Sequence, residues 1–402
     1  MAFRRITIVS GSSLFAAALW LIAGVLPRCA AAEIPEPVRQ ALESNARSLS
    51  PITIAWERTR TSDLPRPRAL SLMHSSSLFL PHQSRFLWDN GRYFIRIVNR
   101  SYRLDIQPDG RTTELTDGPV STAEVDQTFD GEKRYSLTKI DSAGVAGILI
   151  IDRPAHHITN KQNITYLSPD FFNHVGFHFP ERAEDYEAKR PAKSLPLYLV
   201  EQGASVIEVG REEVDGVSCT ALVLRSGTAE YRFVLDPAKG YAVRRRIDKT
   251  PSGELAVRAD CSDFAQLSGS RLWMPRKVEV EWHSWPGVLA KPVKEVVVRE
   301  TFRVSELKSE PIPPEQFVLK PDQPGTDVAD STVEGRKDSQ GRVNYVVPAD
   351  PSRLDEVIRD AASGNAPERT IWRFRRPFIL ANFLLILILM GAVWWRARRK
   401  SL

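Results

Sequence analysis

The sequence lacks the short motifs that mark the common enzyme classes. It contains no G-x-S-x-G nucleophile elbow, no H-E-x-x-H zinc motif, no P-loop and no dinucleotide-binding glycine pattern. Two S-x-x-K matches begin at Ser136 and Ser305, but no K-T-G companion follows either of them. We therefore expect no catalytic residues and no cofactor, and we predict that the chain is not an enzyme.

Histidine is scarce, with seven residues among 402. His156 and His157 are adjacent, so on a strand they point to opposite faces and cannot share a metal. His174 and His178 are four residues apart, as helical zinc ligands are, but Gly176 lies between them and no acidic partner stands at the usual spacing. We expect these two histidines to pack among the neighbouring aromatic residues, and we predict no metal site.

The body of the chain also lacks an excess of positive charge, although the whole chain has a formal net charge of +6. Eleven of the 55 Lys and Arg residues lie before Glu33 or between Arg369 and Lys400, whereas all 49 acidic residues lie between Glu33 and Glu368. The body therefore carries 44 basic and 49 acidic side chains, a net charge of −5. Because nucleic-acid binding first requires a basic surface, we exclude nucleic acid as a partner.

The first 32 residues have the pattern of a secretory signal peptide. Arg4 and Arg5 precede an apolar run from Leu14 to Leu26, and three alanines follow at positions 30–32. A positive start, a short apolar core and small residues at the end are typical of such a segment. We predict that residues 1–32 direct export and that cleavage leaves Glu33 as the first residue.

Near the other end lies the one long apolar run outside the signal segment. Residues 377–395 contain no charged side chain, and at about 1.5 Å per residue a helix of this length matches a bilayer core. Basic residues flank the run on both sides, and Trp394 and Trp395 stand where an aromatic belt lies. We predict a transmembrane helix over 377–395 and a basic cytoplasmic tail over 396–402. The chain is then a single-pass protein of a bacterial inner membrane with its body in the periplasm.

Only two of the three cysteines lie in the predicted mature chain, Cys219 and Cys261. The compartment beyond the membrane permits disulfides, and a loop of this length gives a bridge worth about 3–4 kcal/mol. We predict a disulfide between the two residues. Two separate buried thiols are the alternative.

The body reads as one early helix followed by many short strands. Residues Pro35–Ser48 repeat apolar side chains at helical spacing, and Ile52–Thr61 then alternate as a strand does. Turn pairs separate β-rich runs at Asn90-Gly91, Asp130-Gly131 and Asp215-Gly216. We predict that residues 33–330 form one exported domain, mainly β with few helices (α+β), built on a curved antiparallel sheet or half-barrel.

A few other segments depart from this strand pattern. A second short helix is plausible at Pro169–Gly176, and Glu184–Ser194 is typical of a surface loop. After the β domain the chain turns polar, and we predict a polar stalk over 331–376 with one short helix at Pro351–Ala362.

Three local sequences resemble the LolA/LolB-like superfamily of lipoprotein carriers. The helix PEPVRQALESNARS runs directly into ITIAWERTR, FLWDNGRYFIR is similar to a hairpin of that family, and PIPPEQFVLKPDQPGTDVAD resembles its closing segment. The resemblance implies a strongly curved sheet that forms a half-barrel around helices, with a lipid or lipoprotein as ligand. The body is longer than a bare carrier and is tethered by a predicted helix, which argues against a freely shuttling protein.

Aromatic side chains gather in two dense groups, around Phe86–Phe94 and around Phe171–Phe179. On a curved sheet they either line an apolar groove or fill an ordinary core. For the groove, the candidate ligand-binding residues are Trp56, Trp88, Phe94, Leu149 and Phe233. We predict a membrane-anchored, non-catalytic periplasmic module that binds a lipid, an acyl chain or a lipoprotein-like ligand. The alternatives are a structural or envelope-signalling ectodomain that binds a protein partner, and an envelope hydrolase.

Overall fold

The computed structural model describes residues 32–65, 68–69, 80–106, 112–115, 120–140, 145–153, 170–180, 190–284, 293–321 and 323–364. The chain divides into two compact units. Unit 1 comprises residues 1–122 with 161–313, and unit 2 comprises residues 123–160 with 314–402. The predicted single domain over 33–330 therefore consists of parts of both units.

Apart from Ala32, the predicted signal segment lies outside the described residues, as do the predicted span over 377–395, the tail and the pair His156 and His157. Within the described ranges, no helix combines the length and the apolar character needed to cross a membrane.

Unit 1 begins with the helix and hairpin that the sequence predicts. Helix α2 (Glu36–Arg47) has Pro35 at its N-cap and buries Val38, Leu42 and Ala46 along one face. Strand β1 (Ile52–Thr61) follows, and β2 (His82–Asp89) and β3 (Arg92–Ser101) form the next hairpin. Asn90 and Gly91 both have positive φ, 49° and 84°, as a two-residue hairpin turn requires.

The remaining elements of unit 1 are short helices and a long series of strands. They are β4 (Arg103–Ile106), β5 (Thr112–Leu115), α4 (Asp170–His174), β9 (Phe177–His178), β10 (Lys193–Ser194), α6 (Leu195–Glu201), β11 (Ser205–Val214), β12 (Val217–Ser226), β13 (Ala229–Asp236), η5 (Pro237–Lys239), β14 (Ala242–Lys249), β15 (Leu255–Gln266), β16 (Trp273–Trp282) and β17 (Val298–Lys308). The predicted helix at Pro169–Gly176 is confirmed as α4, whereas Lys193 and Ser194, expected in a loop, form β10.

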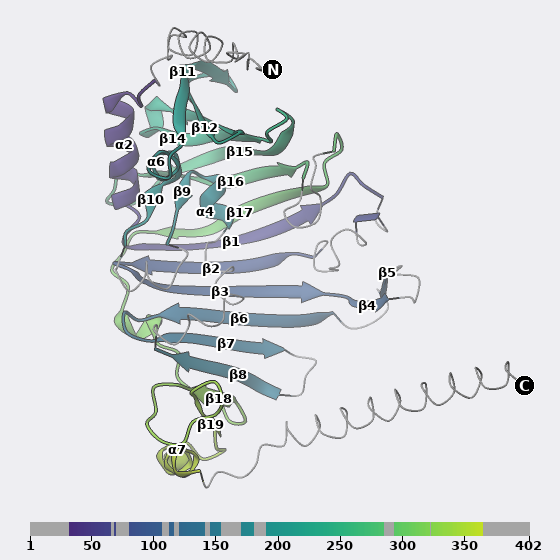
Figure 1. The fold of residues 1–402 in the computed structure, drawn as a ribbon, viewed down its shortest axis with the longest axis vertical. Helices are drawn as coiled ribbons and strands as arrows, with labels where there is room; N and C mark the ends of the chain where they lie inside the picture. Colours follow the sequence, from purple (N-terminus) through teal and green to yellow (C-terminus); the bar gives the residue numbers. More distant parts are fainter. Residues whose placement is uncertain are drawn as a thin grey trace, which may run out of the picture. The chain divides into compact units, whose positions relative to one another are not determined.

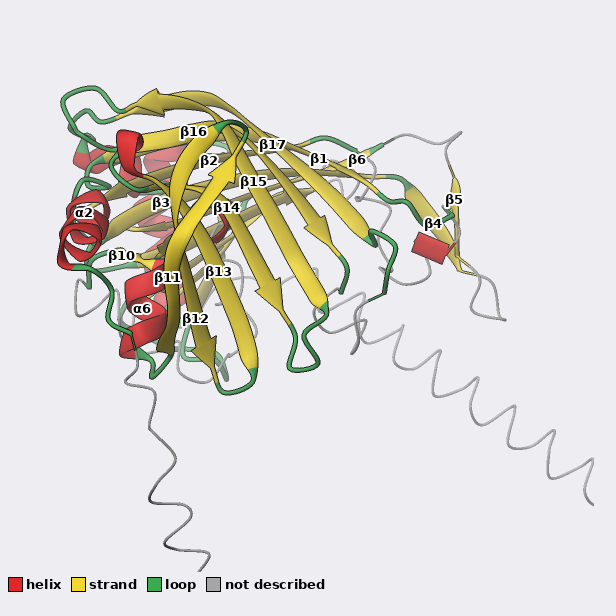
Figure 2. Cartoon of the chain, turned by 90° about the horizontal axis from the view of Figure 1, so that it is seen from above, coloured by secondary structure: helices red, strands yellow, loops and turns green. Residues whose placement is uncertain are grey.

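The main sheet of unit 1 is antiparallel and curved. Its strands follow the order β11-β12-β13-β14-β15-β16-β17-β1-β2-β3, so that β1 joins the early hairpin to the late strands (Figure 1). Figure 2 shows the bend of the strands from β11 to β14 beside α2 and α6. We call the side of this sheet that carries α4 and α6 its covered face. The strand registers place Trp56, Phe302, Ala259, Phe233 and Leu222 on that face.

The predicted disulfide is not formed, because the two cysteines lie on opposite faces of this sheet. Cys261 faces α4, where its thiol donates to the His174 carbonyl at 4.0 Å, whereas Cys219 packs with Val214 and Val234 on the other face. Strands β13 and β14 also separate β12 from β15, a distance of about 14 Å at 4.8 Å per strand. Both thiols are free and buried, which was the alternative reading.

Unit 2 is built from two segments that are far apart in sequence. Its elements are β6 (Ser121–Phe129), β7 (Arg134–Ile140), β8 (Val145–Asp152), η6 (Pro314–Phe317), β18 (Asp327–Asp330), β19 (Val343–Val346), η7 (Pro351–Arg353) and α7 (Leu354–Ser363). Strands β6, β7 and β8 form an antiparallel meander, but β18 pairs with β8 in parallel, an exception to the predicted antiparallel pattern.

The predicted polar stalk over 331–376 is wrong for its first half. Val343, Tyr345 and Val347 are buried against β7, β8 and β18, and Ala361 of α7 joins the same core. The predicted short helix at Pro351–Ala362 is confirmed as η7 and α7. The polar residues around these strands belong to turns of a folded unit.

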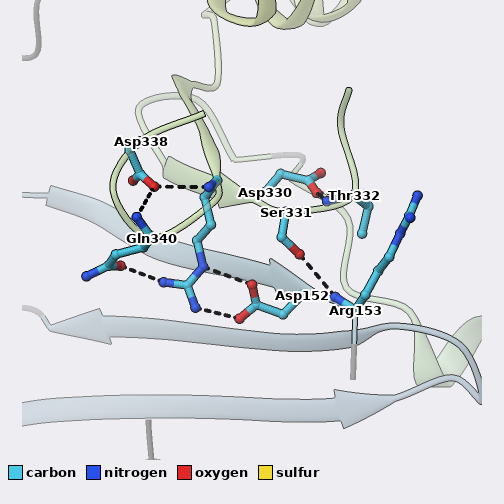
Figure 3. A network of polar contacts seen from close by, with 8 residues as sticks. Asp152, Arg153, Asp330, Ser331, Thr332, Asp338 and Gln340 are labelled. Atoms are coloured by element: carbon cyan, nitrogen blue, oxygen red, sulfur yellow. Dashed lines mark hydrogen bonds and ion pairs between the residues drawn. The ribbon is translucent and has the colours of Figure 1, made fainter. Parts of the chain in front are cut away.

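A buried ion pair ties the two segments of unit 2 together (Figure 3). The Arg342 guanidinium donates to both carboxylate oxygens of Asp152, at 2.8 and 2.7 Å, and to Gln340 at 2.7 Å. Asp338 accepts the backbone N–H groups of Gln340 and Arg342, which holds the loop that presents the guanidinium. The hydrogen bonds to Asp152 raise the pKa of Arg342, so the pair remains charged.

Candidate functional site

Helix α4 fills one part of the covered face with aromatic rings. The Phe171 ring stacks on Trp56 at 5.3 Å, and Phe172 meets Phe86 edge-to-face at 5.2 Å. Phe179 closes the group against Phe86 and Phe172, at 5.2 and 4.5 Å. At this end of the sheet, the described residues of the covered face form a packed aromatic core.

The five candidate residues lie in different places. Trp56 and Trp88 belong to the aromatic core, Trp88 through its contacts with Phe86 and Phe179. Phe233 packs with Val38 and Leu42 of α2 in a neighbouring cluster of unit 1. Phe94 pairs with Leu87 and faces the opposite side of the sheet, where Arg96 lies over its ring at 5.7 Å.

Leu149, the fifth candidate, lies in the core of unit 2 with Tyr135 and Val328. The structure therefore brings Trp56 and Trp88 into one cluster and leaves the other three candidates apart. All five side chains are buried.

Described residues of unit 1 line two open pockets, and the larger of these two lies next to this core and has a volume of about 510 Å³. Its walls come from α6, from the end of α4 and from the strands of the covered face. They include Leu195, Tyr198, Leu199, Tyr231, Val257 and Trp282. This volume falls in the range of about 300–1,000 Å³ that is typical of small-molecule sites.

Helix α6 separates this pocket from a second one. Leu195, Tyr198 and Leu199, at spacing i, i+3 and i+4, line the larger pocket. Leu197 and Val200 line the second pocket, which has a volume of about 310 Å³ beside α2. Because each side of the helix opens onto a pocket, its apolar side chains from Leu197 to Val200 are only half-buried.

Two contacts position α6 at the pocket wall. The Leu195 N–H donates to the Gly176 carbonyl at 2.8 Å, and the His178 ring stacks on Tyr198 with centroids 3.6 Å apart. Gly176 has φ +88°, and a Cβ there would lie 2.5 Å from the Val243 side chain. Only glycine allows the chain to leave α4 so close to the sheet.

The basic side chains that line the larger pocket, within the described residues, are paired. Arg246 donates to both carboxylate oxygens of Asp248, at 2.8 and 2.5 Å, and to the Asn173 carbonyl at 2.8 Å. Lys249 donates to Glu230 at 2.8 Å, and this hydrogen bond lowers the pKa of Glu230. The pocket therefore combines apolar side chains with basic side chains whose charge is already paired.

A buried carboxylate lies behind the pocket. Glu300 accepts hydrogen bonds from Trp282 at 2.8 Å and from Arg60 at 2.6 Å, with Arg58 3.7 Å away. Burial alone would raise the pKa of Glu300, but the two arginines outweigh it and lower the pKa, so this group is ionised. The ion cluster fixes the Trp282 side chain that forms one wall.

His174, the last residue of α4, lines the pocket and has unusual surroundings. It is 3% exposed and packs against Trp282 at 5.6 Å and Phe302 at 5.8 Å. Among the residues that the structure describes, neither ring nitrogen has a hydrogen-bond partner. Burial, reinforced by the positive charges of Arg246 and Arg58, lowers its pKa to about 3, so the ring is neutral at physiological pH.

This depressed pKa makes stability depend on pH. The unfolded chain binds a proton on His174 below pH about 6.5, whereas the folded chain stays neutral there, so folding stability falls as pH falls from about 6.5 toward 3. His174→Phe removes this dependence. Between about pH 7 and pH 5 we expect wild type to lose about 2 kcal/mol more unfolding free energy than the variant, measured by urea denaturation. A constant difference between the two proteins would contradict the neutral buried histidine.

No arrangement of His174 and His178 suits a metal. The His178 ring stacks on Tyr198, and in the part of the chain that the structure describes no three His, Cys, Asp or Glu side chains are placed to hold an ion. The expected aromatic packing of these histidines is confirmed.

The solved structures that are similar to this chain include the following three. A LolA superfamily protein from Nitrosomonas europaea aligns with TM-score 0.35 and 9% identity over 70% of this chain and 97% of its own. An outer membrane lipoprotein-sorting protein domain from Vibrio parahaemolyticus, so described, aligns with TM-score 0.32 and 10% identity over 67% and 88%. A DUF1329 family protein from Desulfovibrio piger aligns with TM-score 0.31 and 11% identity over 71% and 98%.

These likenesses agree with the distant LolA-like resemblance that the sequence predicts. No family model matches the sequence, and no curated protein matches it either.

Proposed function

We propose that unit 1 binds a lipid, an acyl chain or a lipoprotein-like apolar ligand in the larger pocket, without catalysis. The observation that carries this proposal is the pocket of about 510 Å³ itself, a space between α6 and the covered face with apolar side chains on several of its walls. Leu199, Tyr231 and Val257 offer an acyl chain apolar surface on several sides.

Two further observations support an apolar ligand. The basic side chains that line the pocket, within the described residues, are already paired. A ligand in the pocket would therefore meet little unpaired charge. Helix α6 has half-buried apolar side chains on both of its sides. A ligand in the larger pocket would cover those on the side that faces this pocket.

Native mass spectrometry of the exported body tests this function. The body is produced with its signal segment in bacteria, without the predicted span, and purified without detergent. We expect a copurifying lipid or acyl compound, released when the protein is denatured. A body that carries no such compound, and that binds none when it is added, would end the proposal and favour a partner-binding ectodomain.

We propose in addition that the body is periplasmic and that residues 377–395 anchor it in the inner membrane. The signal pattern of residues 1–32 and the uncharged run near the C-terminus motivate this topology. Protease added to intact spheroplasts should then degrade the body. Full protection of the body would contradict this topology.

A further inference from the structure

The buried ring of His174 is a polar group that packs against the rings of Trp282 and Phe302. A neutral imidazole has one N–H donor and one acceptor nitrogen, and here both are unpartnered. Leaving such groups unpaired in a folded interior costs stability, and native proteins rarely do so without a reason. The ring is therefore a candidate for a partner that arrives with the ligand.

The surroundings of His174 limit what that partner can be. Arg246 on one side is engaged with Asp248 and with the Asn173 carbonyl, and Glu300 on the other side is engaged with Arg60 and Trp282. A charged ligand group at this point would meet no unpaired charge among these neighbours. An uncharged oxygen, in contrast, can accept the imidazole N–H without leaving a buried ion uncompensated.

A ligand in the pocket would approach His174 beside Trp282 and Leu195, which line the pocket with it. Both ring nitrogens of His174 expose less than 1 Å² in this structure. The rings of Trp282 and Phe302 pack against the imidazole without hydrogen bonds to it. A ligand that enters the pocket can replace part of this packing and receive the N–H.

We propose that His174 is a specificity-determining residue, which donates a hydrogen bond to an uncharged carbonyl oxygen of the ligand. The ligand is then an apolar chain that carries an ester, rather than a bare hydrocarbon. This inference rests on the proposed function, because it requires that the pocket takes an apolar ligand.

Competition binding tests the inference with the full chain held in an amphipathic polymer. A fluorescent phenylnaphthylamine is displaced either by the methyl ester of a saturated fatty acid or by the alkane with the same number of heavy atoms. We expect the ratio of ester affinity to alkane affinity to be about three- to tenfold higher in wild type than in His174→Phe, the effect of one neutral hydrogen bond. In His174→Phe, which keeps a packed ring, ester affinity should fall while alkane affinity is retained.

Two controls keep the outcomes distinct. His283→Phe changes a histidine that is not among the residues lining this pocket, and it should retain the ester preference. His174→Gln, which keeps an uncharged donor, should retain part of it. Partition of each compound into the polymer is the same for all variants and cancels in the comparison.

A vibrational measurement on wild type alone is independent of whether His174→Phe folds. The carbonyl stretch of the bound ester should shift to lower frequency than in an apolar solvent. An unshifted carbonyl, or a ratio of ester affinity to alkane affinity that is unchanged in His174→Phe, would overturn the inference and leave the apolar pocket in place. If wild type binds neither the ester nor the alkane, the proposed function fails, and this inference fails with it.

Discussion

Replacing Leu199 by Asp is expected to weaken binding of an apolar ligand about 100-fold, because a carboxylate would then face the ligand inside the larger pocket. Leu199 is half-buried, so in the free protein the new carboxylate keeps part of its water. An acyl chain that fills the pocket must remove that water. Desolvating the carboxylate therefore reduces the free energy of ligand binding more than it reduces the free energy of unfolding.

Leu197→Asp is the matched control for this prediction. Leu197 lies on the same short helix and is also half-buried, but it faces the second pocket beside α2. The same substitution there should have a similar effect on stability, with little effect on ligand affinity. Affinity is measured by displacement of a fluorescent apolar probe from each purified variant. Equal losses for both variants would show that the larger pocket is not the ligand site.

Much of unit 1 was predictable, because its signals are local. The turn at Asn90-Gly91 needs positive φ at two successive residues, which few other pairs supply. The apolar spacing of Val38, Leu42 and Ala46 is likewise readable without any distant contact. Such features depend on a few neighbouring residues, and the structure has them where the sequence places them.

Unit 2 was not predictable in the same way, because it depends on contacts between distant segments. Asp330 pairs in parallel with Ile151, which lies 179 positions earlier in the chain. No local sequence pattern predicts such a pairing. The short strand Val343–Val346 lies among polar turn residues. The high average polarity of the whole segment therefore gave no indication of a strand. The alternation of Val343, Tyr345 and Val347 was a readable signal of a buried strand face, and the polar stalk hypothesis overlooked it.

The candidate site was predicted only in its chemistry. Apolar and aromatic side chains do line the pocket, but the expected lining residues Trp56 and Trp88 are buried elsewhere. Trp56 packs on Phe171 of α4, and Trp88 packs on Phe86 and Phe179. Whether a ring fills a core or borders a space depends on where a short helix rests on the sheet. The position of α6 depends on the positive φ of Gly176 and on the hydrogen bond from the Leu195 N–H to the Gly176 carbonyl. Residue periodicity reveals neither of these features. The sequence indicated packing for His174, but it could not show that both ring nitrogens lack partners.

The largest stability effect is expected from Asp152→Ala in unit 2. The Asp152 side chain is 1% exposed and holds Arg342, itself 12% exposed, through two short hydrogen bonds (Figure 3). Removing the carboxylate leaves a guanidinium without its counter-ion, a change that costs about 3–5 kcal/mol in buried pairs. Because Asp152 ends β8 and Arg342 precedes β19, the loss should loosen the parallel pairing of β8 with β18 and its partner β19.

Glu334→Ala and a double variant separate this ion pair from general effects of substitution. Glu334 pairs with Arg153 at 3.8 Å, but both side chains are more than half exposed, so its loss should cost less than about 1 kcal/mol. Asp152→Leu combined with Arg342→Met removes both charges and should destabilise unit 2 less than Asp152→Ala alone, since no unpaired ion remains. Urea unfolding gives the free energies, and hydrogen exchange of the β8, β18 and β19 amides localises the effect. If the double variant were as unstable as Asp152→Ala, lost packing rather than an unpaired guanidinium would be the cause.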